Sequence, residues 1–320
     1  MNFEVLSNTE GLSEDEWLAL RKKGIGGSDI AAIAGVSPWK NAITVFLDKI
    51  GEAPEKSVGE AAYWGHKHEQ VIADEFAERN GCKVVEVKAI IQHPDKAWMI
   101  GDIDRAIMDE EMGTGILECK STGALTPTAA CYDEDEGVAN EHLCQLQWYM
   151  AITGLEWGFI AVLIGGNRYV ERYIKRDQET IDHLIKIGSD FWDLVHRREM
   201  PAIDGSDESA RILDYLYSKT RAESIELTGE VAERMAKQLV QTKADIKAAE
   251  AREQEASNTV KALMGEHELA FCPGYQLSWK PVTTNKFRQK DFEQAHPALF
   301  KGFTSPTTYR RFSVKEKKRE

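Results

Sequence analysis

The chain has 320 residues, of which 42% are hydrophobic, so it is long enough for a large domain with an appended segment. Its formal charge of −13 excludes a uniformly basic nucleic-acid-binding protein but permits a local basic surface. The sequence has no run of about 18 apolar residues, so we expect no membrane span. The five cysteines include no C-x-x-C pair, which disfavours a disulfide framework and a zinc or iron–sulfur site. Together with an acidic start that lacks a signal-peptide pattern, this predicts a cytoplasmic protein.

The first 80 residues predict helices separated by glycine turns. Ser13 and Glu16 form a capping-box pattern that predicts a helix over the following residues. The glycines of residues 24–35 predict a tight turn and a short helix capped by Ser28 or Asp29, and Ser37–Pro38 is a possible start of the next helix. Residues 60–79 have helical periodicity, and Gly81 is suited to end that helix.

The pattern then becomes typical of strands. Residues 82–94, 98–108 and 115–121 predict three strands, with a glycine-containing turn that brings the second back antiparallel to the third. A helix follows over 141–154. We then expect a further strand pair over 157–177 and a long helix over 177–199.

A proline and a polar run after residue 200 predict a domain boundary, with one domain over 1–204 and an extension over 205–320. Residues 229–265 have coiled-coil spacing with polar residues on the seam, so both a weak coiled coil and a helical hairpin remain open. The last forty residues carry ten Lys and Arg against four acidic residues. Together with its aromatic residues, this charge suits DNA binding. Alternatively, these residues belong to a small packed domain whose charges are only solvated. A third alternative is that the region binds another copy of the chain or a partner protein.

The residues with the clearest chemical signal are Glu118 and Lys120 in the third strand. Side chains two apart in a strand point to the same face, so an acid and an amine lie side by side. The same rule places Asp102 and Asp104 on one face of the preceding strand. If these strands form a hairpin, one of the aspartates faces Glu118.

Carboxylates this close repel unless a cation lies between them or one is protonated. Carboxylate oxygens of Glu118 and of one of these aspartates, with the main-chain carbonyl of Cys119 as a further ligand, suit a hard ion such as Mg²⁺ or Mn²⁺. Lys120 would then orient or deprotonate a water, and the site would suit phosphodiester hydrolysis. The alternative is a solvated cross-strand pair.

A third acid lies on the predicted helix over 60–79. Glu69 shares a helical face with Ile72 and Phe76, and an acid on an apolar face needs a cation or a hydrogen-bond partner. Alternatively it is a boundary glutamate. His66 and His68 flank it, either as ordinary surface residues or with one of them near a phosphate.

The order of these motifs, from RKKGIGGSDIAAIAG and WGHKHE through GDIDR and ILECKST to HLCQLQWYMAITG, resembles the PD-(D/E)XK nucleases. Within them the chain is most similar to the YqaJ-type viral recombinases of the lambda exonuclease family. The resemblance covers residues 12–200. It implies an α/β fold of the restriction-endonuclease-like type, with a mixed central sheet flanked by helices and a mainly helical C-terminal extension.

The resemblance also implies roles for individual residues. Metal ligands would be Asp104 and Glu118, with Glu69 binding or supporting the metal, and Lys120 would position the attacking water. Gln145 or Gln147, with Tyr149, would support the site. In the lambda-type enzymes an arginine and a serine seven residues apart hold the 5′-phosphate of the shortened strand. Here Arg21 and Ser28 have this spacing.

The function implied is an Mg²⁺-dependent, ATP-independent 5′→3′ exonuclease. It would act on double-stranded DNA ends and produce 3′ overhangs for phage-type recombination in a bacterial host cell. Family members work with a single-strand annealing protein, and some form homotrimers. One departure is Asp102, which stands where the lambda-type pattern has a phosphate-binding serine and should repel phosphate. An endonuclease of the same superfamily and a non-catalytic DNA-binding or scaffold protein remain alternatives.

Overall fold

A computed structural model describes residues 3–54, 59–307 and 309–315. The chain divides into two compact units, Met1–Tyr217 and Ser218–Glu320, which are described separately below. Helix α8 (Asp207–Leu216) follows the expected boundary at residue 204 but belongs to the first unit. It is attached there because the Asn41 side-chain amide donates to the Oγ atoms of Ser206 and Ser209, at 3.0 and 2.9 Å.

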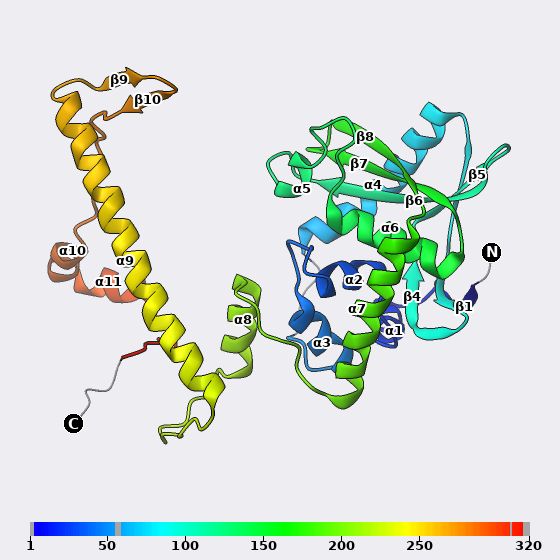
Figure 1. Cartoon of the computed structure of the whole chain (residues 1–320), viewed down its shortest axis with the longest axis horizontal. Coiled ribbons are helices and arrows are strands. Elements are labelled where there is room, and N and C mark those ends of the chain that lie inside the picture. Colours follow the sequence, from blue (N-terminus) through cyan, green and yellow to red (C-terminus); the bar gives the residue numbers. More distant parts are fainter. Residues whose placement is uncertain (1–2, 55–58, 308, 316–320) are drawn as a thin grey trace. The chain divides into compact units, whose positions relative to one another are not determined.

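The first unit is built on a five-stranded sheet of order β2-β5-β6-β7-β8 (Figure 1). Its strands are β2 (Lys83–Glu86), β5 (Arg105–Asp109), β6 (Gly113–Thr122), β7 (Trp157–Ile164) and β8 (Arg168–Lys175). The β6–β7 pair is parallel and the other pairs are antiparallel, so the sheet is mixed. The predicted fold class is therefore confirmed.

Helices cover both faces of this sheet, and strand β6 shows how. Its residues alternate between two apolar clusters: Ile116 packs with Leu146 of α6 (Asn140–Thr153), whereas Leu117 packs with Phe76 of α4 (Glu60–Asn80). Helix α7 (Gln178–Arg197) packs against α6 and adds a further layer on that side. Glu118 and Lys120 therefore lie on the face covered by α6.

A second, three-stranded sheet has the order β1-β3-β4, with β1 (Glu4–Asn8), β3 (Ala89–His93) and β4 (Lys96–Asp102). The expectation of single strands over 82–94 and 98–108 was wrong. Each run breaks, near residue 87 and at residues 103–104, and crosses from one sheet to the other. The hairpin partner of β6 is therefore β5 alone, with Arg105 opposite Leu117.

The N-terminal helices follow their local signals in part. The capping box of α1 (Glu14–Arg21) is present as predicted. Helix α2 (Gly27–Ile33) instead begins after Gly26, whose N–H donates to the side chain of Asp29. Asn41 caps α3 (Ala42–Ile50), so Ser37–Pro38 does not open it.

The predicted helix ends at Gly81 and Gly154 are confirmed, since both residues have the left-handed conformation that favours glycine. A short helix, α5 (Pro127–Ala130), follows β6.

The second unit consists of α9 (Glu230–Met264), the hairpin of β9 (Leu269–Cys272) and β10 (Tyr275–Ser278), α10 (Gln289–Ala295) and α11 (Pro297–Gly302). Because α9 is continuous, residues 229–265 do not form a helical hairpin. Residues 316–320, the charged end of the predicted basic tail, lie outside the described residues.

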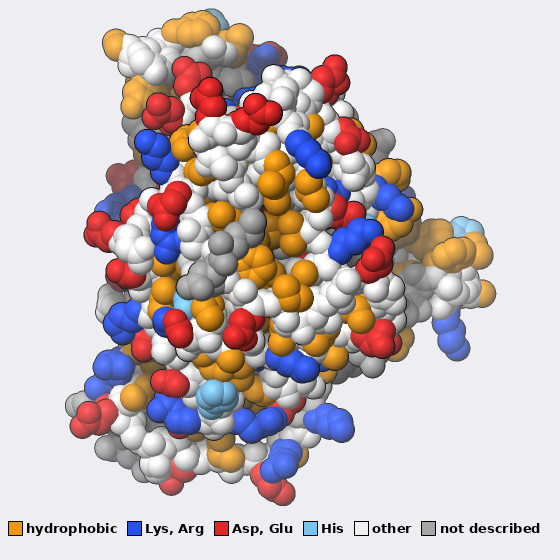
Figure 2. All heavy atoms as spheres, turned by 90° about the vertical axis from the view of Figure 1, so that its right-hand side faces the viewer, with side chains coloured by type: hydrophobic (Ala, Val, Ile, Leu, Met, Phe, Trp, Pro, Cys, Tyr) orange, Lys and Arg blue, Asp and Glu red, His pale blue; other side chains and the backbone are white. Residues whose placement is uncertain are grey.

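Two further expectations concern the surface and the membrane. The face in Figure 2 mixes basic and acidic side chains, and no field of one sign covers it. Within the ranges that the structure describes, no helix is long and apolar enough to cross a bilayer.

Candidate active site

Strand β6 brings an acid and an amine together in the interior, as predicted. The Lys120 Nζ atom lies 2.6 Å from Oε1 of Glu118, and the Glu118 side chain is fully buried. Two residues on one strand face are held at this spacing by the backbone itself. A solvated surface pair does not describe this arrangement, because water does not reach the carboxylate.

Asp104 joins the pair from the bend before β5. Its Oδ2 accepts a hydrogen bond from the main-chain N–H of Cys119, at 2.9 Å. The N–H and C=O of a strand residue point to the same edge, so the Cys119 carbonyl also faces the side of Asp104. This is the edge of β6 beyond the last residue paired with β5.

Asp102 does not share this position, and the expected common face of the two aspartates was wrong. The strand is interrupted at residues 103–104, so the two-residue alternation does not continue across the bend. The Oδ2 of Asp102 instead accepts from the indole N–H of Trp17, at 2.9 Å.

The electrostatics of the site follow from burial. Burial, followed by the charge of Asp104, raises the pKa of Glu118 from 4.5 to about 8, although the Lys120 ammonium opposes this. Burial also raises the pKa of Asp104. For Lys120 burial acts to lower the pKa, but the charges of Glu118 and Asp104 outweigh it and the pKa rises.

Helix α6 supports the carboxylate through Gln145. Its Nε2 donates to Oε1 of Glu118 at 2.5 Å and to the hydroxyl oxygen of Tyr149 at 3.0 Å. Gly27 allows this approach, since a Cβ there would lie 2.6 Å from Cγ of Gln145 and 2.8 Å from the Tyr149 ring. Gln145 and Tyr149 therefore lie together beside Glu118, as predicted.

Gln147 lies elsewhere. Its Nε2 donates to the carbonyl of Lys175 at 2.7 Å, and its Oε1 accepts from the N–H of Asp177 at 3.0 Å. These contacts tie α6 to the connection between β8 and α7. Of the two glutamines named from the sequence, Gln145 contacts the site and Gln147 does not.

Glu69 of α4 lies at the margin of the acidic group. Burial, followed by the charge of Asp104, raises its pKa, so the two carboxylates are close enough to interact. Its Oε2 is 3.3 Å from Nδ1 of His66, which is largely exposed. His68 instead shares a 2.9 Å hydrogen bond with the hydroxyl of Ser121, next to Lys120.

The oxygens of this site match a hard divalent cation in chemistry. Glu118 Oε2 is buried without a hydrogen-bond partner, which is costly unless a cation or a proton neutralises it. Among the described residues, however, no three His, Cys, Asp or Glu side chains are arranged to hold a metal. An ion here would bind Asp104 and Glu118, with the Cys119 carbonyl and water completing its shell and Glu69 at the edge.

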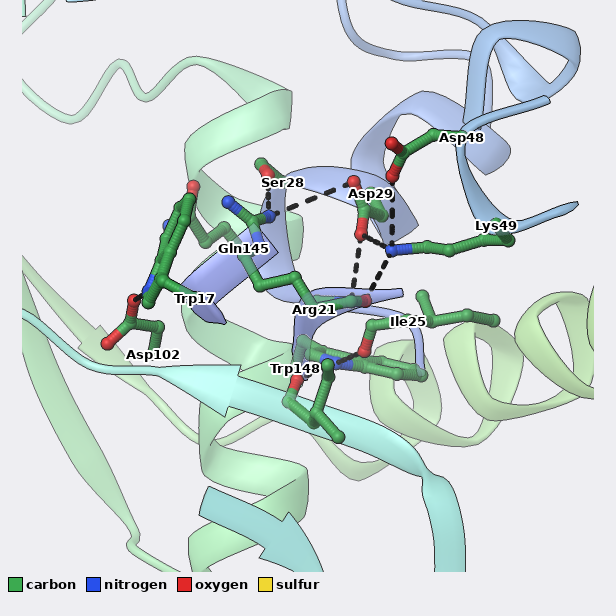
Figure 3. A network of polar contacts seen from close by, with 12 residues as sticks. Trp17, Arg21, Ile25, Ser28, Asp29, Asp48, Lys49, Asp102, Gln145 and Trp148 are labelled. Atoms are coloured by element: carbon green, nitrogen blue, oxygen red, sulfur yellow. Dashed lines mark hydrogen bonds and ion pairs between the residues drawn. The ribbon is translucent and has the colours of Figure 1, made fainter. Parts of the chain in front are cut away.

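The second predicted group, Arg21 and Ser28, is also brought together (Figure 3). Nη2 of Arg21 donates to Oγ of Ser28 at 3.1 Å and lies 3.9 Å from Oδ1 of Asp29. Asp29 is buried, and its pKa is lowered because the charges of Lys49, Arg21 and Lys40 outweigh the effect of burial. These contacts of the arginine–serine pair thus join the N-terminus of α2 to the end of α1.

Sequence reasoning missed Lys49, which contacts Asp29 and the main chain of Arg21. Its side chain is almost fully buried, and Nζ lies 2.7 Å from Oδ2 of Asp29 and 2.8 Å from the carbonyl oxygen of Arg21. The available signal was a lysine in the mainly apolar helix AITVFLDKI, since a buried lysine requires an acidic partner.

These features define a mixed α/β protein with a buried carboxylate–lysine centre and a hydrogen-bonded arginine–serine pair. The family of YqaJ-like viral recombinase domains matches residues 16–156. The protein YqaJ of Bacillus subtilis (strain 168) is 37% identical over 318 residues, with 98% of both chains covered. The chain therefore belongs to the YqaJ-like viral recombinase family.

Solved structures give weaker similarities. An alkaline exonuclease (LHK-Exo) from Laribacter hongkongensis matches with a TM-score of 0.47 and 20% identity, over 57% of this chain and 93% of that one. A phage-related exonuclease from Haemophilus somnus 129PT matches with a TM-score of 0.41 and 13% identity, over 57% and 97%.

Proposed function

We propose that this protein is a metal-dependent, ATP-independent deoxyribonuclease that trims double-stranded DNA ends in the 5′→3′ direction and leaves 3′ overhangs for recombination by strand annealing. The observation that carries the proposal is the unpartnered, buried oxygen of Glu118, held beside Lys120 and Asp104. Membership of a viral recombinase family supports the recombination role.

Each residue contributes a defined part. Glu118 and Asp104 would hold Mg²⁺, or Mn²⁺ in its place, and the bound ion would supply charge neutralisation at the phosphate. Lys120 keeps an ammonium beside these carboxylates, where it can orient a water by hydrogen bonding. Gln145 fixes the rotamer of Glu118 through Oε1 and leaves Oε2 available.

The arginine–serine pair supports an exonuclease over an endonuclease. Ser28 follows Gly27, which packs on Gln145 and Tyr149, so the arginine–serine pair is joined to the proposed catalytic centre through the start of α2. A guanidinium with a hydroxyl suits a terminal phosphate. Under this proposal the partners are a double-stranded DNA end, a single-strand annealing protein and further copies of the chain.

The test compares linear DNA with 5′-phosphate ends, linear DNA with 5′-hydroxyl ends and covalently closed circular DNA, each with Mg²⁺ or EDTA. We expect Mg²⁺-dependent nucleotide release from linear DNA, with the circle spared. Cutting of the circle would favour an endonuclease, and release in EDTA would contradict the metal. A protein that binds DNA but cuts none of these substrates would be a scaffold.

A matched pair of lysine variants makes this test specific. Lys120→Ala should lower the release by roughly 10²- to 10⁴-fold. Lys186→Ala removes a surface lysine that pairs with Asp190 on α7 and should leave it unchanged.

A further inference from the structure

A chain of contacts connects Asp102 of β4 to Arg21 through Trp17 (Figure 3). The Trp17 indole N–H donates to Oδ2 of Asp102 at 2.9 Å. The Cζ atom of Arg21 lies 4.7 Å from the centroid of the Trp17 ring. Trp17 and Arg21 are four residues apart on α1 and therefore share one helical face.

These contacts fix a side chain that would otherwise be mobile. Arginine has several rotatable bonds, and an unsupported guanidinium at a helix end loses considerable entropy when it binds an anion. Here the indole holds the guanidinium on one side while Ser28 accepts from Nη2 on the other. The hydrogen bond to Ser28 uses one of the five N–H donors of the guanidinium, which leaves donors for a ligand.

Asp102 has a defined use in this arrangement. Its carboxylate was expected to repel a phosphate, but Oδ2 is directed to the indole N–H and is engaged there. An indole with a fixed N–H has a fixed ring plane, and the ring plane determines where the guanidinium stacks.

We propose that Asp102 and Trp17 are positioning residues that orient Arg21 for the phosphate at a DNA strand end, and so set the preference for 5′-phosphorylated over 5′-hydroxyl ends. The inference rests on the proposed function, because it assigns the substrate end to that same site. Neither residue contacts the reacting atoms. Both act through the position of the Arg21 guanidinium.

The experiment uses the full chain and measures KM and kcat separately on otherwise identical duplexes with 5′-phosphate or 5′-hydroxyl ends. The preference is the KM for the 5′-hydroxyl end divided by the KM for the 5′-phosphate end. Trp17→Leu removes the ring and the N–H, and it should reduce this ratio by roughly three- to tenfold, which corresponds to the loss of a partly desolvated cation–π contact. Trp17→Phe keeps a ring and should lose less. Asp102→Ala should resemble Trp17→Leu. Asp102→Asn retains an oxygen acceptor and should keep the preference within about twofold.

Different results would overturn the proposal. If Asp102→Ala and Asp102→Asn both increase the preference for phosphate, Asp102 acts by repulsion and not by positioning. If Trp17→Leu changes KM equally for both ends, Trp17 only stabilises the fold. Asp190→Asn, which neutralises a surface carboxylate of α7, is the matched control for charge removal.

Binding without cleavage separates this inference from the proposed function. Fluorescence anisotropy of the wild-type chain in EDTA, with duplexes of the two end types, measures their binding affinities even if no nuclease activity exists. Tighter binding of the phosphorylated end that is lost in Trp17→Leu supports the inference. Equal affinity of the wild type for both ends contradicts it, whether or not the chain cleaves DNA.

Discussion

The two units of this protein differ in how much of their side chains they bury. The first unit contains two apolar clusters with buried polar groups such as Glu118 and Asp29 placed between its elements. In the described part of the second unit, Met264 is the one buried side chain. The chemical argument depends on this difference, since exclusion of water raises the pKa of a carboxylate and strengthens its interaction with a neighbouring charge.

The long helix of the second unit shows the opposite situation. Helix α9 leaves Val231, Met235 and Ile246 exposed, and its own contacts include pairs at i,i+4 such as Glu233 with Lys237. Such pairs stabilise a helix by only tenths of a kcal/mol each. The charged residues of α9 therefore do not define a site on their own.

The largest expected effect contrasts a lysine from each unit. Lys120→Ala should lower nucleotide release by roughly 10²- to 10⁴-fold, because it removes the ammonium beside Glu118 and Asp104. Lys261→Ala removes an ammonium that lies over the Trp279 ring at 6.0 Å, and it should change the rate by less than about twofold. Single-turnover digestion of an end-labelled duplex measures both. A comparable loss in Lys261→Ala would show that the second unit takes part in catalysis.

The next largest effect is on stability, and it is measured with an isoleucine-to-alanine substitution in each unit. Ile91 is fully buried, and Ile91→Ala should lower the free energy of unfolding by about 2–5 kcal/mol. Ile246 is 53% exposed, and Ile246→Ala should cost about 0.5 kcal/mol or less. Urea unfolding followed by circular dichroism gives both values. A large cost at Ile246, increasing with protein concentration, would indicate that another copy covers α9.

The sequence was informative where one local rule decides the structure. The alternation of strand side chains was enough to place Glu118 beside Lys120, and the Ser13–Glu16 capping box was enough to locate α1. The Arg21–Ser28 pair came from the resemblance, and the structure confirms only that the two side chains meet.

The features that were not predicted depend on the tertiary arrangement. The residues around Ile103 form a continuous strand-like run, and nothing local indicates that the chain changes sheet there. Gln145 and Gln147 both lie inside one helix, so only the packing of α6 decides which one reaches Glu118. The partner of the buried Lys49 comes from another helix, twenty residues away.

The free energy of unfolding of the first unit should depend on pH through Glu118, which has no counterpart among the described residues of the second unit. Because the folded pKa of Glu118 is about 8 and its ordinary value is 4.5, the folded state keeps a proton between these values that the unfolded chain has released. The free energy of unfolding of the metal-free protein should therefore fall as pH rises from about 4.5 to about 8, by up to about 1.4 kcal/mol per pH unit from this group.

Urea titrations in EDTA at several pH values measure this slope, and Glu118→Gln should lack that component of it. Seven of the eight tryptophans lie in the first unit, so tryptophan fluorescence reports mainly on its unfolding. Mg²⁺ should reduce the slope, because it favours the ionised carboxylate. An identical slope in the wild type and Glu118→Gln would contradict the raised pKa.

The smallest expected effect comes from removing the second unit. A chain that ends at Tyr217 keeps α8, with Ser209 buried against the Asn41 amide and Ile212 in the core. Its Tm should lie within about 4 °C of the full chain, since a loss of 1 kcal/mol shifts a domain of this size by about 2–4 °C.

A chain that ends at residue 204 should melt at a clearly lower temperature. It loses the buried Ile212 side chain and leaves the Asn41 amide without its partners Ser206 and Ser209. Differential scanning calorimetry of the two truncated chains therefore places the limit of the folded domain. If ending at Tyr217 lowers the Tm as much as ending at 204, the first unit depends on residues beyond α8, and its independence from the second unit is refuted.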